Sequence, residues 1–193
     1  MSIFTKPLNN IELSLTEDDL PYSDNEPMET EKHVLQLQLL MDILKNHYDG
    51  ERVYVGGNMF VYYSAHQVKT EDFKGPDFFV ALDVEPGLRK SWVVWQEKKV
   101  PDVVVELISE STARIDKYEK KLIYEYKLKI PEYYWYSPIT DEWAGYILKK
   151  GEYVPIQADN NGLISHQLKM YLVQWRGIYM GVEGNWLRWS DLG

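Results

Sequence analysis

Two carboxylates flank a run of valines in the segment PDVVVELIS, which spans residues 101–109. In a strand, alternate side chains share a face, so Asp102 and Glu106 would lie on one side with Val104 between them. An isolated buried carboxylate is costly unless it is paired or binds a metal. These acids could therefore face solvent, form ion pairs or bind a cation. Asp102 follows Pro101 and is typical of a strand start, whereas Glu106 lies inside the apolar run and is the stronger candidate for chemistry.

A further carboxylate, Asp77, opens the strand-like segment GPDFFVALDV at residues 75–84. If this strand pairs with residues 101–109, Asp77 and Glu106 would converge at one end of a sheet. Oxygen ligands without His or Cys suit Mg²⁺ or Mn²⁺ rather than Zn²⁺. The chain has four histidines without zinc-ligand spacing and no cysteine, which excludes disulfides and thiolate metal sites.

A predicted helix, ARIDKYEKKLIYEYKLK at residues 113–129, supplies a third group of side chains. Asp116, Lys120 and Tyr124 are spaced by four and would form one stripe on this helix. On spacing alone, the stripe is an ordinary Asp–Lys pair on a solvated face. The residues expected to pack on the sheet lie off the stripe: Ile115, Leu122 and Tyr126.

The remaining segments predict the elements that would position these residues. Residues 1–30 are polar and contain prolines, which indicates an N-terminal arm or loop, and residues 31–193 are expected to form one domain. Residues 31–48 follow a capping Thr30 and have helical spacing of apolar side chains. Those side chains are Val34, Leu37, Leu40, Met41, Ile43 and Leu44.

Strand-like runs occupy residues 52–63, 75–84, 91–96 and 132–138, and short strand-like runs alternate with turns in the tail. The glycine pair at 56–57 suggests a bend within the first of these runs. Ser111 or Thr112 could cap the second helix, which Pro131 closes. The order of helix, strands, helix, strand and β-rich tail predicts an α/β fold with a mixed sheet.

Composition narrows the classes of function. The chain has 193 residues and a formal net charge of -9, so general electrostatic attraction to nucleic acid would be weak without a basic patch or a bound cation. The first residues lack the basic start and apolar core of a signal peptide, and no apolar run is long enough to span a bilayer. We therefore expect a soluble, cytoplasmic protein with no membrane partner.

In their order and spacing, several segments resemble the Uma2 family of endonucleases, formerly a domain of unknown function and abundant in cyanobacteria. The family belongs to the PD-(D/E)XK nuclease superfamily. The resemblance covers about residues 18–138 and is weaker in the tail. The matching segments are DLPYSDNEPMETEKH, VYVGGNMFVYY, GPDFFV, PDVVVELIS, DKYEKKLIY and PEYYWYSP.

The resemblance implies a restriction-endonuclease-like fold: a central mixed β-sheet flanked by helices, here with extra C-terminal β-hairpins. Asp77 corresponds to the aspartate of the PD signature and Glu106 to the acid of (D/E)XK. The lysine expected two residues later is absent, because Ile108 occupies that position. Its place is taken in this family by a helical lysine, which matches Lys120, with Lys121 as the neighbouring competitor. A further helical glutamate would be Glu29 or Glu31.

The implied activity is hydrolysis of phosphodiester bonds in nucleic acid, with DNA as the expected substrate and RNA left open, and with Mg²⁺ or Mn²⁺ held by Asp77 and Glu106. The alternative is a nuclease fold without catalysis that acts in protein or nucleic-acid binding, since function resides in the site and not in the fold. The absent in-line lysine and the acidic composition favour this alternative. The tyrosines and tryptophans of the C-terminal half could form a homodimer surface, although sheet packing is the commoner use.

Overall fold

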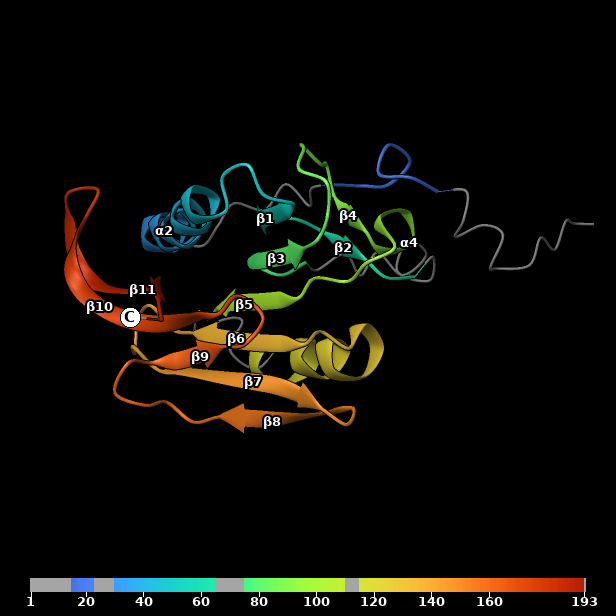
Figure 1. Ribbon diagram of the computed structural model, residues 1–193. Helices are drawn as coiled ribbons and strands as arrows, with labels where there is room; N and C mark the ends of the chain where they lie inside the picture. The colour runs from blue at the N-terminus through green and yellow to red at the C-terminus, as the bar shows by residue number, and fades with distance from the viewer. Residues whose placement is uncertain (1–14, 23–29, 65–74, 110–114, 193) are drawn as a thin grey trace, which may run out of the picture.

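A six-stranded mixed sheet forms the centre of the computed structural model, which describes residues 15–22, 30–64, 75–109 and 115–192. Its strands run in the order β1-β3-β5-β6-β7-β8, from top to bottom in Figure 1. The β5–β6 pair is parallel and the other pairs are antiparallel. The bounds are β1 Val53–Gly57, β3 Phe78–Leu82, β5 Val103–Leu107, β6 Glu132–Tyr136, β7 Trp143–Lys149 and β8 Glu152–Ile156.

Two smaller sheets flank this one. The C-terminal sheet has the order β11-β10-β9, and its long hairpin curves along the left edge in Figure 1. Its strands are β9 Leu163–Ser165, β10 Met170–Tyr179 and β11 Val182–Asp191. A two-stranded parallel sheet pairs β2 (Val61–Tyr62) with β4 (Trp92–Val93). The antiparallel strands β9, β10 and β11 confirm the predicted extra C-terminal β-structure.

Within the described residues, four helical segments accompany the sheets: α2 Glu31–His47, α4 Val94–Glu97, η1 Ile115–Lys120 and η2 Ile123–Leu128. Thr30 caps α2 as expected, because its side-chain oxygen accepts a hydrogen bond from the His33 N–H. The predicted helix at 113–129 is mostly π-helical, since η1 and η2 are both π-helices. π-Helical turns are rare and frequently occur at functional sites.

Both faces of the central sheet are covered, which gives three layers. One face packs against α2 and the C-terminal sheet through a cluster that includes Leu40, Val105, Tyr134, Leu172 and Trp189. The other face packs against η2 and the small β2–β4 sheet through Phe79, Trp92, Val104, Tyr124 and Tyr133. All five residues of β5 are therefore buried, including Glu106.

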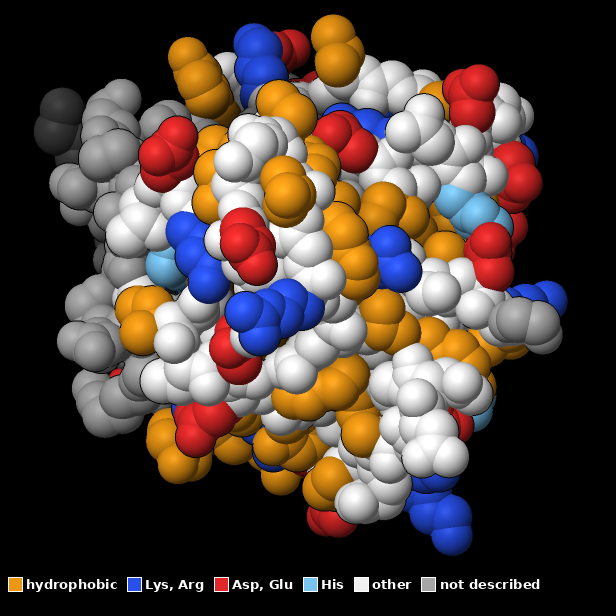
Figure 2. Space-filling model, turned by 90° about the vertical axis from the view of Figure 1, so that its left-hand side faces the viewer, with side chains coloured by type: hydrophobic (Ala, Val, Ile, Leu, Met, Phe, Trp, Pro, Cys, Tyr) orange, Lys and Arg blue, Asp and Glu red, His pale blue; other side chains and the backbone are white. Residues whose placement is uncertain are grey.

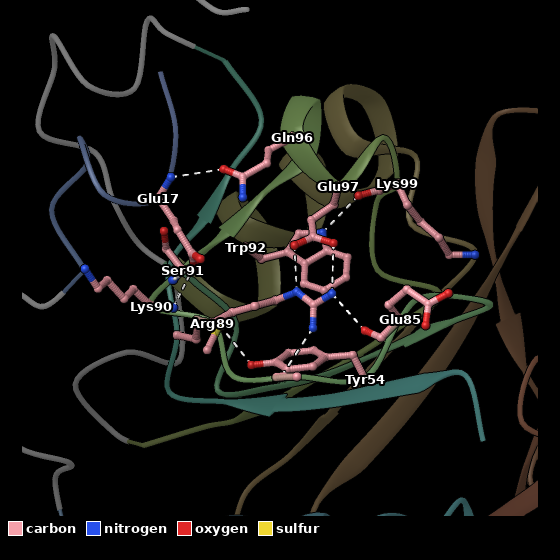
Figure 3. A network of polar contacts seen from close by, with 12 residues as sticks. Glu17, Tyr54, Glu85, Arg89, Lys90, Ser91, Trp92, Gln96, Glu97 and Lys99 are labelled. Atoms are coloured by element: carbon pink, nitrogen blue, oxygen red, sulfur yellow. Dashed lines mark hydrogen bonds and ion pairs between the residues drawn. The ribbon is translucent and has the colours of Figure 1, made fainter. Parts of the chain in front are cut away.

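Arg89 fixes the segment between β3 and α4, as Figure 3 shows. Its guanidinium contacts the rings of both Tyr54 and Trp92, 4.6 and 5.1 Å from their centroids, which themselves lie 5.3 Å apart. It also donates to both carboxylate oxygens of Glu97, at 2.6 and 3.0 Å, and to the Glu85 carbonyl. This bidentate, stacked arrangement holds α4 against the edge of the sheet.

Several local predictions were wrong. Val34 is exposed, while the polar His33 and Gln36 are buried on α2, where Gln36 exchanges hydrogen bonds with the backbone of Leu187. The predicted strand at 91–96 ends at Val93 and continues as α4. The bend in the 52–63 segment falls after the glycine pair, at Asn58, whose φ is 47°.

Within the described part of the predicted arm, Leu15 and Leu20 pack against Phe60, Tyr62 and neighbouring side chains. Residues 1–14 and 23–29, and the predicted caps Ser111 and Thr112, lie outside the described residues. Across the described ranges, no helix is long and apolar enough to cross a membrane.

Candidate active site

Asp77 and Glu106 lie next to each other at one end of the central sheet. Strands β3 and β5 pair antiparallel with Phe78 opposite Val105, which brings the start of β3 to the end of β5. The Asp77 N–H donates to Glu106 Oε2 at 3.4 Å, and the Leu107 N–H donates to Asp77 Oδ2 at 2.7 Å. The carboxylates expected to converge through strand pairing therefore do so.

Glu106 is completely buried and is contacted from the helix that follows β5. Lys120 Nζ lies 2.9 Å from Glu106 Oε2 and donates to the Gly75 carbonyl at 3.3 Å. The Tyr124 hydroxyl donates to Glu106 Oε1 at 2.5 Å. Both carboxylate oxygens thus have strong donors, which is what makes an ionised group tolerable in a buried position.

Tyr124 acts as a fixed hydrogen-bond donor in this cluster. Burial raises the pKa of its hydroxyl well above the ordinary value of 10.0, and the Glu106 carboxylate adds to that shift. The hydroxyl therefore keeps its proton and holds one Glu106 oxygen in place. The four-residue stripe pointed to Tyr124, but its spacing alone indicated no role in the site.

The helix turns the opposite face to the sheet from the one predicted. Lys120 and Tyr124 point inward, whereas Leu122 and Tyr126 are 52% and 57% exposed. The solvated Asp–Lys pair favoured by spacing alone is therefore wrong for Lys120, whose side chain is 13% exposed. The reason is the buried carboxylate, since Glu106 requires donors and Lys120 and Tyr124 of this helix supply two of them. The side chains of Ile115 and Asp116 lie outside the described ones.

The other candidates lie elsewhere. Asp102 has a structural role. Its Oδ2 accepts a hydrogen bond from the Leu82 N–H at 2.7 Å and forms an ion pair with Lys99 Nζ at 3.0 Å. Ile108, at the position of the missing lysine, is buried. Lys121 Nζ lies over the Tyr146 ring, 4.4 Å from its centroid, and Glu31 is exposed in the first turn of α2. Glu29 lies outside the described residues.

A second buried carboxylate, Glu132, was not identified from the sequence. Its Oε2 accepts from the Ser165 and Tyr134 hydroxyls at 2.6 and 3.1 Å. Its Oε1 accepts from the backbone N–H groups of His166 and Gln167 at 2.7 and 3.1 Å. Glu132 therefore joins β6 to the C-terminal sheet. Glu132 opens its strand directly after Pro131, the same pattern that made Asp102 typical of a strand start, so the local sequence did not single it out.

The donor set at Asp77 and Glu106 fits a hard divalent cation. Throughout the described residues, no group of three or more His, Asp or Glu side chains could hold a metal ion. Mg²⁺ commonly keeps several waters and binds to one or two carboxylates together with substrate phosphates. Two adjacent carboxylates, of which Asp77 is partly exposed, meet that requirement, whereas a closed protein cage does not form here.

Comparison with known proteins agrees with this architecture. A crystal structure described as a putative nuclease of DUF820 from Anabaena variabilis ATCC 29413 is similar to this chain, with a TM-score of 0.52 and 12% sequence identity. The match covers 78% of this chain and 88% of the other, so it supports a common fold. No curated protein matches the chain. The model of the Uma2 family, described as "Putative restriction endonuclease", matches residues 13–175, and the chain therefore belongs to the Uma2 family.

Proposed function

We propose that this protein is a metal-dependent endonuclease that hydrolyses phosphodiester bonds in nucleic acid, with DNA as the expected substrate. The observation that carries the proposal is the cluster of Asp77, Glu106 and Lys120, drawn from β3, β5 and η1 to one end of the sheet. Two carboxylates and a lysine are the groups that metal-assisted phosphodiester hydrolysis requires. The family description supports the same reaction.

Each residue has a distinct task in this reaction. Asp77 and Glu106 would hold Mg²⁺ or Mn²⁺. When bound, such a cation supplies Lewis acidity and neutralises charge on a phosphate. Lys120 donates hydrogen bonds from a partly buried position, where its charge can stabilise the negative charge that grows on the phosphate. Tyr124 and the Leu107 N–H keep the two carboxylates oriented.

The net charge of -9 is compatible with a nucleic-acid substrate because positive charge is locally concentrated. The segment 115–129 contains five lysines against three acids, and one of those acids, Glu125, is buried and accepts from the Tyr153 N–H. Figure 2 shows the left-hand side of Figure 1, away from this segment, and there basic, acidic and hydrophobic side chains are interspersed. The charge of the 115–129 segment, rather than the net charge, would meet the substrate.

The test is cleavage of plasmid DNA, linear duplex DNA and single-stranded DNA with Mg²⁺, with Mn²⁺ and with a chelator. We expect cutting that needs the metal. Asp77→Asn, Glu106→Gln and Lys120→Ala should each abolish it, while Lys121→Ala should retain it because Lys121 lies over Tyr146. Metal-independent cutting, or cutting that survives in all three variants, would refute the assignment.

A second candidate is a binding module that does not cut, and one observation favours it. Both Glu106 oxygens already have partners in Lys120 and Tyr124, which is an arrangement that also suits a purely structural ion pair. This candidate predicts nucleic-acid or protein binding without turnover under any metal. Binding that is unchanged in Glu106→Gln, together with no cleavage, would favour it over the nuclease.

A further inference from the structure

We propose that Trp135 and Lys117 form a binding platform for the nucleotide beside the scissile phosphate. This inference rests on the proposed nuclease function and adds to it a class of substrate: a strand whose bases are unpaired, or become unpaired, at the site. In the proposed arrangement, the indole of Trp135 stacks on a nucleobase and the ammonium group of Lys117 contacts the adjoining phosphate.

The position of Trp135 follows from the register of the parallel pair β5–β6. Trp135 is the direct partner of Glu106 in that pair. Partners in register point to the same face of the sheet, and neighbouring strands lie only about 5 Å apart. The indole therefore stands beside the carboxylate that would hold the metal, on the face covered by the helix that carries Lys120.

The exposure of Trp135 distinguishes it from its neighbours. Tyr133, Tyr134 and Tyr136 on the same strand are fully buried, whereas Trp135 is partly exposed. Large aromatic side chains are ordinarily placed in a core for stability. The indole of Trp135 packs against the core cluster of this face, and its exposed part, next to the reacting groups, offers a surface on which a base can stack. Such stacking tolerates any base because every base has a π-face.

Lys117 supplies the charge at the same place. Its Nζ lies 4.0 Å from the centroid of the Trp135 ring and 3.4 Å from Glu142 Oε2. Lys117 and Lys120 both belong to η1, so the same helix carries both ammonium groups. The contacts of Lys117 are weak ones, because Glu142 is exposed and both ion pairs and cation–π contacts contribute little at exposed sites. A phosphate could therefore replace them.

The chain contains a matched control for this pair. Arg188 lies over the ring of Trp175, 5.0 Å from its centroid, on β10 and β11 of the C-terminal sheet. Trp175 is also partly exposed, and it carries the same kind of cation contact. Trp175→Ala and Arg188→Ala thus remove equivalent groups away from Asp77 and Glu106.

The experiment measures binding of labelled oligothymidylate, and of an abasic oligomer of equal length, by fluorescence anisotropy in a chelator. Wild-type protein should bind oligothymidylate on the order of tenfold more tightly than the abasic strand. Trp135→Ala should remove that difference, Trp135→Phe should keep part of it, and Trp175→Ala should leave it intact. Circular dichroism verifies that each variant is folded.

Lys117→Ala should weaken binding of both oligomers and reduce the salt dependence of binding, by about 0.7 in the slope of log K against log salt concentration. Arg188→Ala should leave that slope unchanged. The platform is refuted if wild-type protein binds the two oligomers equally, or if Trp135→Ala preserves the difference between them.

Failure of this inference can be told apart from failure of the nuclease proposal, since binding is measured without metal. If metal-dependent cutting occurs but Trp135→Ala still binds oligothymidylate more tightly than the abasic strand, the platform is wrong and the nuclease proposal stands. If Trp135→Ala loses the preference for oligothymidylate over the abasic strand but no substrate is cut, the platform stands as a binding site and the nuclease proposal fails.

Discussion

Lys120 of η1 and Glu106 of β5 form a buried ion pair, with 2.9 Å between Nζ and Oε2 and a Glu106 side chain that is fully shielded from solvent. Removing one partner of such a pair leaves an uncompensated buried charge. Lys120→Ala should therefore lower the free energy of unfolding at neutral pH by about 3–5 kcal/mol, as measured by urea denaturation. The double variant Lys120→Met with Glu106→Gln should recover part of the loss. Equal stability of Lys120→Ala and wild type would show that the pair is not buried in solution.

Tyr124 should contribute to the same cluster through one hydrogen bond. Tyr124→Phe keeps the ring and removes the donor to Glu106 Oε1, which should cost about 1–3 kcal/mol of stability. Tyr126→Phe is the control, because Tyr126 is exposed on the same helix and should change stability little. If the two variants are equally stable, the Tyr124 hydroxyl does not support Glu106.

Glu132 should make stability depend on pH. Burial raises the pKa of its carboxyl above the ordinary value of 4.5, so the folded protein holds this proton more tightly than the unfolded chain. The resulting stabilisation is complete below the ordinary pKa and is lost as pH rises through the raised one. Relative to Glu132→Gln, wild-type protein should lose free energy of unfolding as pH rises above about 4.5. A difference that does not vary with pH would contradict the raised pKa.

Arg89 should not be replaceable by lysine. Arg89→Lys keeps the charge but loses the bidentate contact with Glu97 and the flat group that contacts the rings of Tyr54 and Trp92. We expect destabilisation of about 1–3 kcal/mol by thermal or urea unfolding. Arg52→Lys is the control, since the Arg52–Glu85 pair is exposed and contributes little. A similar result for both substitutions would show that the Arg89 contacts are not formed.

The sequence predicted the parts of the site that follow from strand geometry. Asp77 directly precedes β3 and Glu106 is the next-to-last residue of β5, so antiparallel pairing alone brings them together. It also predicted the helix that carries Lys120. What it could not predict is the inward face of that helix, because hydropathy favours Leu122 inside. The orientation is decided by a long-range requirement, the need of buried Glu106 for donors.

Other features depended on contacts between distant segments. The four donors to Glu132 include Ser165, His166 and Gln167, and nothing local in the sequence links those residues to β6. Gln36 is buried within α2 because it exchanges two hydrogen bonds with Leu187, 151 residues away. The local spacing of apolar residues predicts helices and strands. The hydrogen-bond partners of Glu132 and Gln36 depend instead on how the sheets and α2 pack together.

The most direct test of the nuclease account compares two carboxamide substitutions in the same short segment. Glu106→Gln alters the proposed metal ligand, and Asp102→Asn alters the acid that holds the Leu82 N–H and Lys99. Both proteins are assayed for Mn²⁺-dependent DNA cleavage at a temperature where circular dichroism shows them folded. The account predicts cutting by wild type and Asp102→Asn and none by Glu106→Gln. Cutting by Glu106→Gln at the wild-type rate would contradict it.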